Sequence, residues 1–142
     1  MAEISEKRDV VRIARAEGFI KLRKETVEKL KRGEIEKGDV IAAAQIAAIQ
    51  AVKRTWEIIP LCHPIPITGV DVKITVENNG VRVMVTVTTV AKTGVEMEAL
   101  TGVSAALLTV WDMVKAYEKD DKGQYPYTSI EEIKVLEKIK HD

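Results

Sequence analysis

The feature that most constrains this chain is a run without charge. The 13 residues from 99 to 111 contain no ionisable side chain, while Glu98 precedes the run and Asp112 follows it. An apolar helix of this length suits the core of a folded domain. A core helix has no structural use for an acid and an amine one turn apart, yet Asp112 and Lys115 have i, i+3 spacing and share a helix face. Such departures from simple patterning tend to mark function.

The totals indicate one domain over residues 1–142. The chain has a mass of 15.8 kDa and is 46% apolar, which is enough for one core. Its 22 basic residues equal its 22 acidic ones, and it has a single phenylalanine. We therefore expect no nucleic-acid partner. An anion site has to be a local cluster.

Cysteine usage and the N-terminus suggest a cytoplasmic protein. The single cysteine, Cys62, excludes an intrachain disulfide and a zinc site with paired cysteines. The first ten residues are polar and charged, unlike a signal peptide. The run of residues 99–111 is shorter than the roughly 20 residues that span a membrane, so no membrane partner is expected.

The first half of the chain reads as a strand followed by two helices. Residues 9–22 predict a strand in which Arg12 and Arg15 face opposite ways unless a bulge intervenes. A short helix is predicted over Lys24–Arg32, ended by Gly33. A long helix is predicted over residues 40–59, with Asp39 as its N-cap and Pro60 at its end. Ile46, Ile49 and Trp56 are expected to form the apolar stripe of the long helix.

Residues 68–90 predict a β-hairpin. With Asn79 and Gly80 as a two-residue turn, three valine or isoleucine pairs fall on one face, and Glu77 lies opposite Arg82. The expected apolar pairs are Val76 with Val83, Ile74 with Val85, and Val72 with Val87.

The central helix is predicted to begin near Gly94, and residues 129–139 predict a last strand. This order of elements favours an α+β sandwich of the ferredoxin-like type, with an antiparallel sheet covered by helices on one face.

Several ionisable groups are not required by this fold, and each has a structural alternative. Asp112 and Lys115 can pass protons if they are partly buried, or they can be an ordinary surface salt bridge. His63 stands in the proline-rich segment IPLCHPIPITG, whose stiffness can hold it in place, although a lone histidine is often structural. Lys53 is consistent with a solvated helix face. Glu98 can simply favour the helix dipole.

Other chemistries find little support in the residues. There is no HExxH, no CxxC and no second histidine at ligand spacing, so we expect neither a metal nor another cofactor. No motif activates Cys62 as a nucleophile. A phosphate-binding GxxxxGK[ST] loop is absent, which leaves lysines and arginines to hold a phosphate.

Three long segments closely resemble the cyclic pyranopterin monophosphate synthase (MoaC) family of molybdenum cofactor biosynthesis. They read ARAEGFIKLRKET, KGDVIAAAQIAAIQAVKRTWEIIPLCHP and KTGVEMEALTGVSAALLTVWDMVKAYEKD. The LCHP loop, the GVEMEALT stretch and the WDMVKA segment together are highly specific. The resemblance implies a homohexamer built as a trimer of dimers, with active sites at the interface within each dimer.

The resemblance also implies a reaction and residue roles. The substrate is the 3′,8-cyclo-7,8-dihydro-GTP nucleotide, which is rearranged to cyclic pyranopterin monophosphate with release of pyrophosphate. Asp112 matches the catalytic aspartate and Lys115 its partner lysine. Substrate-binding positions are matched by Leu61, Cys62, His63, Met97, Glu98, Lys37, Lys53, Arg12 and Arg15.

The C-terminus departs from the family pattern. The family usually ends its last strand with a K-S-G-G-type motif, whereas this chain reads LEKIKHD, in which Lys138 aligns with the motif's lysine. Glycines there could let a tail close over substrate. The competing hypothesis is a non-catalytic ferredoxin-like module for ligand binding or protein interaction. Convergence of Asp112, Lys115, His63 and Lys37 in one interfacial pocket would favour the enzyme.

Overall fold

The computed structural model describes residues 1–142 as a four-stranded sheet and four helices. The predicted strand over residues 9–22, the helix Lys24–Arg32 and the last strand are all confirmed. In chain order the elements are β1 (Val10–Lys21), α1 (Lys24–Arg32), α2 (Val40–Lys53), α3 (Thr55–Ile58), β2 (Ile67–Glu77), β3 (Gly80–Ala91), α4 (Glu96–Glu118) and β4 (Ser129–His141).

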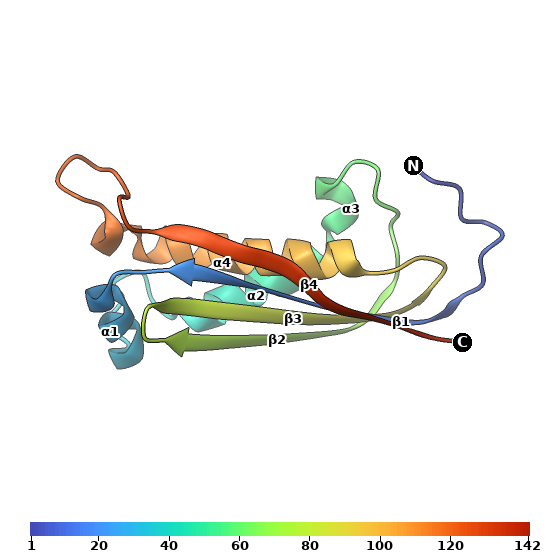
Figure 1. The fold of residues 1–142 in the computed structure, drawn as a ribbon, viewed down its shortest axis with the longest axis horizontal. Coiled ribbons are helices and arrows are strands. Elements are labelled where there is room, and N and C mark those ends of the chain that lie inside the picture. Colours follow the sequence, from blue (N-terminus) through green and yellow to red (C-terminus); the bar gives the residue numbers. More distant parts are fainter.

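The four strands form one antiparallel sheet in the order β2-β3-β1-β4. The helices α2 and α4 lie side by side along one face of the sheet, as Figure 1 shows. This is the ferredoxin-like α+β arrangement that the order of elements predicts. Both chain termini lie at the end of the molecule where α4 begins, and α1 lies at the end where α4 finishes (Figure 1).

The helix α4 forms the centre of the core. Its inner face packs on β1 and β3, and Val103, Leu107 and Val110 are completely buried. Gly102 allows close approach, because a Cβ there would lie 2.8 Å from a methyl group of Val52 in α2. By length and mean hydropathy, α4 is the one helix that could cross a membrane. The packing of α4 on the sheet is a sufficient reason for the apolar residues that give it this hydropathy.

The structure corrects the register of the hairpin by two residues. The turn consists of Asn78 and Asn79, Glu77 pairs with Gly80, and Thr75 pairs with Arg82. A shift of two keeps the same side chains on the core face, so the predicted faces are right although the predicted partners are wrong. The observed apolar pairs are Val76 with Val81, Ile74 with Val83, and Val72 with Val85.

Gly80 explains why the register differs. It belongs to β3 and has no positive φ, so it is not the turn glycine of a type I′ hairpin. A Cβ at this position would lie 1.9 Å from the carbonyl oxygen of Ile20 and 2.6 Å from the ring of Phe19. The glycine is needed because β1 passes too close for any side chain.

The long helix predicted over residues 40–59 is wrong in two respects. It divides at Arg54 into α2 and α3, where the buried Thr55 hydroxyl donates to the carbonyls of Ala51 and Val52. Such bonds from a threonine hydroxyl disturb a helix. The predicted apolar stripe is also wrong, because Ile46 is 57% exposed and Trp56 48% exposed. The small residues face the core instead: Val40, Ala44, Ala48, Ala51 and Val52.

Replacing Gly80 with alanine tests the close approach of β1. We expect Gly80→Ala to lower the free energy of unfolding by about 1 to 3 kcal/mol, because backbone has to move to admit the methyl group. Gly69→Ala is the matched control, since its new methyl would meet Thr88 at an ordinary 3.7 Å. Urea unfolding of both variants makes the comparison. Equal stabilities would show that Gly80 is not constrained.

Candidate functional site

Lys37, Asp112 and Lys115 come together at the C-terminal half of α4, and we refer to them as the Asp112 group. Lys115 Nζ lies 3.0 Å from Asp112 Oδ1. Lys37 Nζ lies 3.3 Å from Asp112 Oδ2 and 3.0 Å from the main-chain oxygen of Asp112. The helix supplies the first pair through its i, i+3 spacing, and the loop between α1 and α2 supplies Lys37. One carboxylate is therefore held between two amines.

The exposure of this group bears on the two alternatives that the sequence left open, a partly buried pair and a surface salt bridge. In the single chain the Asp112 side chain is 60% exposed. Hydrogen bonds from Lys115 and then Lys37 hold the pKa of Asp112 below its usual value. The same bond to Asp112 raises the pKa of Lys115. At neutral pH the pair is therefore a carboxylate and an ammonium.

A second set of predicted residues lies at the other end of α4, and we call it the Glu98 group. It comprises Leu61, Cys62, His63, Met97 and Glu98. The Glu98 side chain is buried, and its Oε2 lies 3.7 Å from the sulfur of Cys62. Its Oε1 is buried without a hydrogen-bond partner. An unpaired buried carboxylate oxygen is costly, which is typical of a functional position.

Burial dominates the chemistry of the Glu98 group. It raises the pKa of Glu98. Burial likewise raises the pKa of the Cys62 thiol, and the neighbouring Glu98 carboxyl adds to this effect. A raised thiol pKa disfavours the thiolate, so the local environment gives Cys62 no activation as a nucleophile. Leu61 and Met97 complete the group as exposed apolar side chains, 71% and 36% exposed.

The N-terminal segment covers His63. The Nε2 atom of His63 donates to the main-chain oxygen of Ala2 at 2.7 Å. His63 also lines a cavity of about 420 Å³ together with Ile4 and Lys92. A ligand that uses this ring nitrogen has to replace the carbonyl of Ala2.

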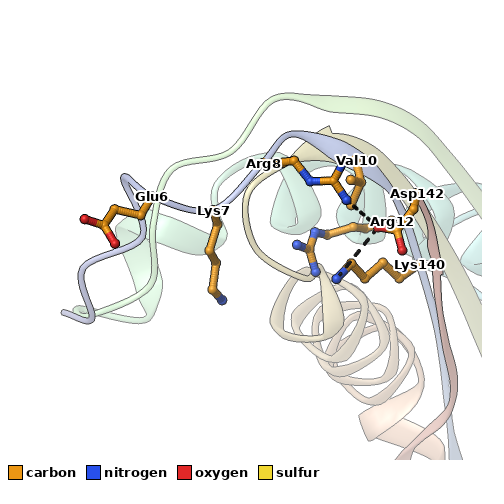
Figure 2. A pocket seen from close by; sticks show the side chains of 7 residues that line it. All are labelled: Glu6, Lys7, Arg8, Val10, Arg12, Lys140 and Asp142. Atoms are coloured by element: carbon orange, nitrogen blue, oxygen red, sulfur yellow. Dashed lines mark hydrogen bonds and ion pairs between the residues drawn. The ribbon is translucent and has the colours of Figure 1, made fainter.

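Arg12 lies in a basic cavity of about 330 Å³ close to the start of α4 (Figure 2). Its guanidinium donates to the main-chain oxygens of Ala91 and Lys92 at 3.1 and 3.2 Å, which fixes its direction. The lining also includes Glu6, Lys7, Arg8, Val10, Lys140 and Asp142. Asp142 pairs with Arg8 and Lys140 at 3.4 and 3.9 Å. The cavity combines four cationic side chains with two acidic ones.

Arg15 and Lys53 stand apart from these clusters. The strand β1 pairs with β3 without a bulge, so Arg12 and Arg15 fall on opposite faces of the sheet. Arg12 is on the helix side, while Arg15 is on the open side, where it contacts Thr86 and Glu137. Lys53 ends α2 and is exposed without an ion pair.

The Asp112 and Glu98 groups do not meet within one chain. Asp112 lies fourteen positions after Glu98 along α4, which is roughly 21 Å at about 1.5 Å per residue. His63 therefore lies at the opposite end of α4 from Asp112, Lys115 and Lys37. The chain presents two separate groups of predicted residues on one continuous helix.

The sequence matches a known family over almost its entire length. The match is to the family described as MoaC family, and it covers residues 1–140. The chain belongs to the MoaC family. This agrees with the resemblance carried by the LCHP, GVEMEALT and WDMVKA segments.

Three relatives show how similar the chain is to other MoaC proteins. A Pyrococcus furiosus protein named "probable cyclic pyranopterin monophosphate synthase" is 61% identical over 142 residues, covering 100% of this chain and 91% of that protein. A Sulfurisphaera tokodaii protein of the same name is 61% identical over 140 residues, covering 99% and 93%. A Methanothermobacter thermautotrophicus protein, named "probable cyclic pyranopterin monophosphate synthase accessory protein", is 59% identical, covering 99% and 88%.

Several polar residues of this MoaC chain escaped the sequence reasoning. Lys7, Arg8 and Lys140 meet only because the start of β1 pairs with the end of β4, which the sequence does not reveal. Lys138, which the sequence aligns with the lysine of the family's C-terminal motif, pairs with Glu96 at the start of α4 at 3.0 Å, a contact that the sequence does not reveal. Glu118 did carry a signal, because a carboxylate at a helix C-terminus opposes the helix dipole. It is 1% exposed.

The raised pKa of Glu98 predicts a pH-dependent stability. A carboxyl whose folded pKa lies above its unfolded value binds its proton more tightly when folded, so stability falls as the pH rises from about 4.5 through the folded pKa. We expect the melting temperature of Glu98→Gln, relative to the parent, to increase over that range. Glu57→Gln, at an exposed position of α3, is the matched control. If the melting temperatures of Glu98→Gln and the parent changed equally with pH, the raised pKa of Glu98 would be contradicted.

Proposed function

We propose that this MoaC protein converts 3′,8-cyclo-7,8-dihydro-GTP to cyclic pyranopterin monophosphate and releases pyrophosphate. The observation that carries the proposal is the Asp112 group, in which one carboxylate contacts two amines at the positions that match the family motif. Relatives that cover the whole chain are named for the synthase reaction. The reaction needs proton transfers and a place for a triphosphate, and this chain has groups suited to both.

In the proposed mechanism, Asp112 and Lys115 are the acid/base pair. In the single chain they are ionised, and the low pKa of Asp112 makes it a weak base. Covering the pair with substrate and a second subunit removes water, which disfavours both charges and favours proton exchange between them. Lys37 then holds the carboxylate in place. The pair opens the purine ring and assists closure of the pyranopterin.

The basic cavity around Arg12 is the proposed phosphate site. Arg12 is already directed by two main-chain oxygens, and Lys7 has no acidic partner. Phosphate oxygens would replace Asp142 as partners of Arg8 and Lys140. His63 is placed to join them once Ala2 moves away. The substrate roles matched by Arg15 and Lys53 stay predictions, because neither residue reaches these clusters within one chain.

We also propose that each active site is shared by two subunits, paired through α4. The outer face of α4 carries Met97, Thr101, Ser104, Leu108 and Asp112, with no charge between its ends. A core helix needs only one apolar face. The uncharged outer stripe therefore suits a second contact, and Leu108 is 60% exposed in the single chain.

Antiparallel pairing of two such helices completes the site. The midpoint between Glu98 and Asp112 is residue 105, so a two-fold axis there sets Glu98 of one subunit opposite Asp112 of the other. The Glu98 group of one chain and the Asp112 group of the other then line the same active site, and each dimer has two such sites. A trimer of such dimers is the proposed homohexamer.

Turnover by Asp112→Asn tests the chemistry. We expect this variant to fold and assemble like the parent but to lose about 100-fold to 10,000-fold in kcat, the usual contribution of an acid/base group. The assay supplies the cyclised dihydro-GTP and measures pyrophosphate and the fluorescence of the oxidised pterin. Asp71→Asn, on the exposed open face of β2, is the matched control.

Full activity in Asp112→Asn would reject the assigned role. A well-assembled parent protein that forms neither product would favour the alternative, a non-catalytic binding or accessory module.

Mixed assemblies test the shared site. Asp112→Asn and His63→Ala are each expected to be inactive, because each damages one of the two partial sites. Random mixing makes half of the dimers heterodimers, and each heterodimer has one intact site, so about a quarter of parent activity should return. A site built within one chain would give no recovery, since every subunit would carry a defect.

A further inference from the structure

The loop between α1 and α2 carries Lys37, and one main-chain hydrogen bond closes it, from the N–H of Gly38 to the carbonyl of Ile35 at 3.1 Å. Ile35 is buried in the core, and Asp39 caps α2 by accepting the N–H of Ala42 at 3.0 Å. Lys37 itself is followed by Gly38, whose φ of 119° lies in a region that glycine tolerates best. No main-chain bond uses the N–H of Glu36 or of Lys37, so a contact from outside the loop can fix the main chain there.

Tyr117 supplies that contact from α4. Its hydroxyl oxygen accepts the main-chain N–H of Glu36, the residue before Lys37, at 2.9 Å. The ring is half-buried, and Lys29 of α1 lies over it with Nζ 5.2 Å from the ring centre. Tyr117 therefore connects α1, the loop and α4 at one point.

The position of Tyr117 on the helix relates it to the Asp112 group. It stands five residues after Asp112 on the same rigid helix. The loop is consequently tied to α4 twice, once by its main chain at Glu36 and once by the Lys37 amine at Asp112. A lysine side chain loses rotamer freedom when it is fixed. Anchoring its backbone on the same helix reduces the movement that would separate the amine from the carboxylate.

We propose that Tyr117 is a positioning residue that holds Lys37 against Asp112 through its hydrogen bond to the main chain of Glu36. It touches neither the reacting groups nor the proposed substrate space, and it acts only through the loop. The effect of Tyr117 on catalysis rests on the proposed function. The placement of Lys37 can be measured without turnover.

Titration of the Asp112 carboxyl by carbon-13 NMR measures the placement. Lys37 and Lys115 are the charged groups that face Asp112, so Lys37→Met should raise the Asp112 pKa toward its ordinary value. Tyr117→Phe keeps the ring and loses only the hydroxyl. We expect it to raise the Asp112 pKa in the same direction by a smaller amount. Tyr127→Phe, whose hydroxyl makes no hydrogen bond, is the matched control and should leave the pKa and turnover unchanged.

Turnover and hydrogen exchange complete the test. Tyr117→Phe should lower kcat by up to about 100-fold, the scale of a small misplacement of a catalytic group, with a smaller effect on KM. In the parent protein, the Glu36 amide should exchange more slowly than the other amides of the loop that lack partners. This last measurement needs no variant, so it holds even if Tyr117→Phe folds poorly.

The outcomes separate this inference from the proposed function. An unchanged Asp112 pKa in Tyr117→Phe, beside a raised one in Lys37→Met, would overturn the positioning role even if turnover fell. The positioning role would also be overturned if the Glu36 amide exchanged as fast as the loop amides without partners. An Asp112 pKa that stayed unchanged in Lys37→Met would overturn it too. A parent without synthase activity whose Asp112 pKa responds to both variants would reject the function while supporting the placement.

Discussion

The close contact of α4 with the sheet and with α2 determines most of this structure. Gly102 lets α2 approach, because any side chain there would meet Val52 and, at 3.3 Å, Val85 of β3. Small residues on both helices keep the helix layer close to the sheet. As a result, α4 packs closely against its neighbours as one continuous helix, and the helix sets the separation of the groups at its two ends. The proposed enzyme depends on that separation, since each end supplies half of a site.

A buried carboxylate fixes the C-terminal end of this helix. The Glu118 side chain accepts main-chain N–H of Arg23 at 3.1 and 3.2 Å, and hydroxyl groups of Thr26 and Thr128. It thereby satisfies a donor at the start of α1, which has no side-chain cap of its own. The unfavourable position of a carboxylate at a helix C-terminus is offset by these bonds. Asp112, Lys115 and Tyr117 all lie within two helical turns of Glu118. The bonds of Glu118 therefore help to set the direction in which these side chains leave the helix.

The sequence predicted the elements and faces well, because periodicity reports which side of a strand or helix is apolar. It was wrong about the hairpin partners, since Asn79-Gly80 is a turn signal and the crowding of Gly80 by β1 is a long-range effect. It was wrong about the stripe of α2, because Ile46 and Trp56 are large but face outward. For the candidate site, motif resemblance predicted the set of residues, while local spacing indicated only the pair Asp112 and Lys115. The contact of Lys37 with Asp112 spans 75 residues and had no local signal.

The uncharged run that constrains the sequence is explained by both faces of α4 taken together. Burial against the sheet requires an apolar inner face, but it leaves the outer face free to carry lysine or glutamate, as surface helices usually do. The outer face instead has Thr101, Ser104 and Leu108 between its charged ends. Excluding charge there costs solubility for a free subunit, yet it lets a second helix approach without burying an unpaired ion. The same exclusion gathers the ionisable groups at residues 96–98 and 112–115, where the proposed antiparallel pairing would join them. One pattern in the sequence thus accounts for the core and suits the proposed interface and divided active site.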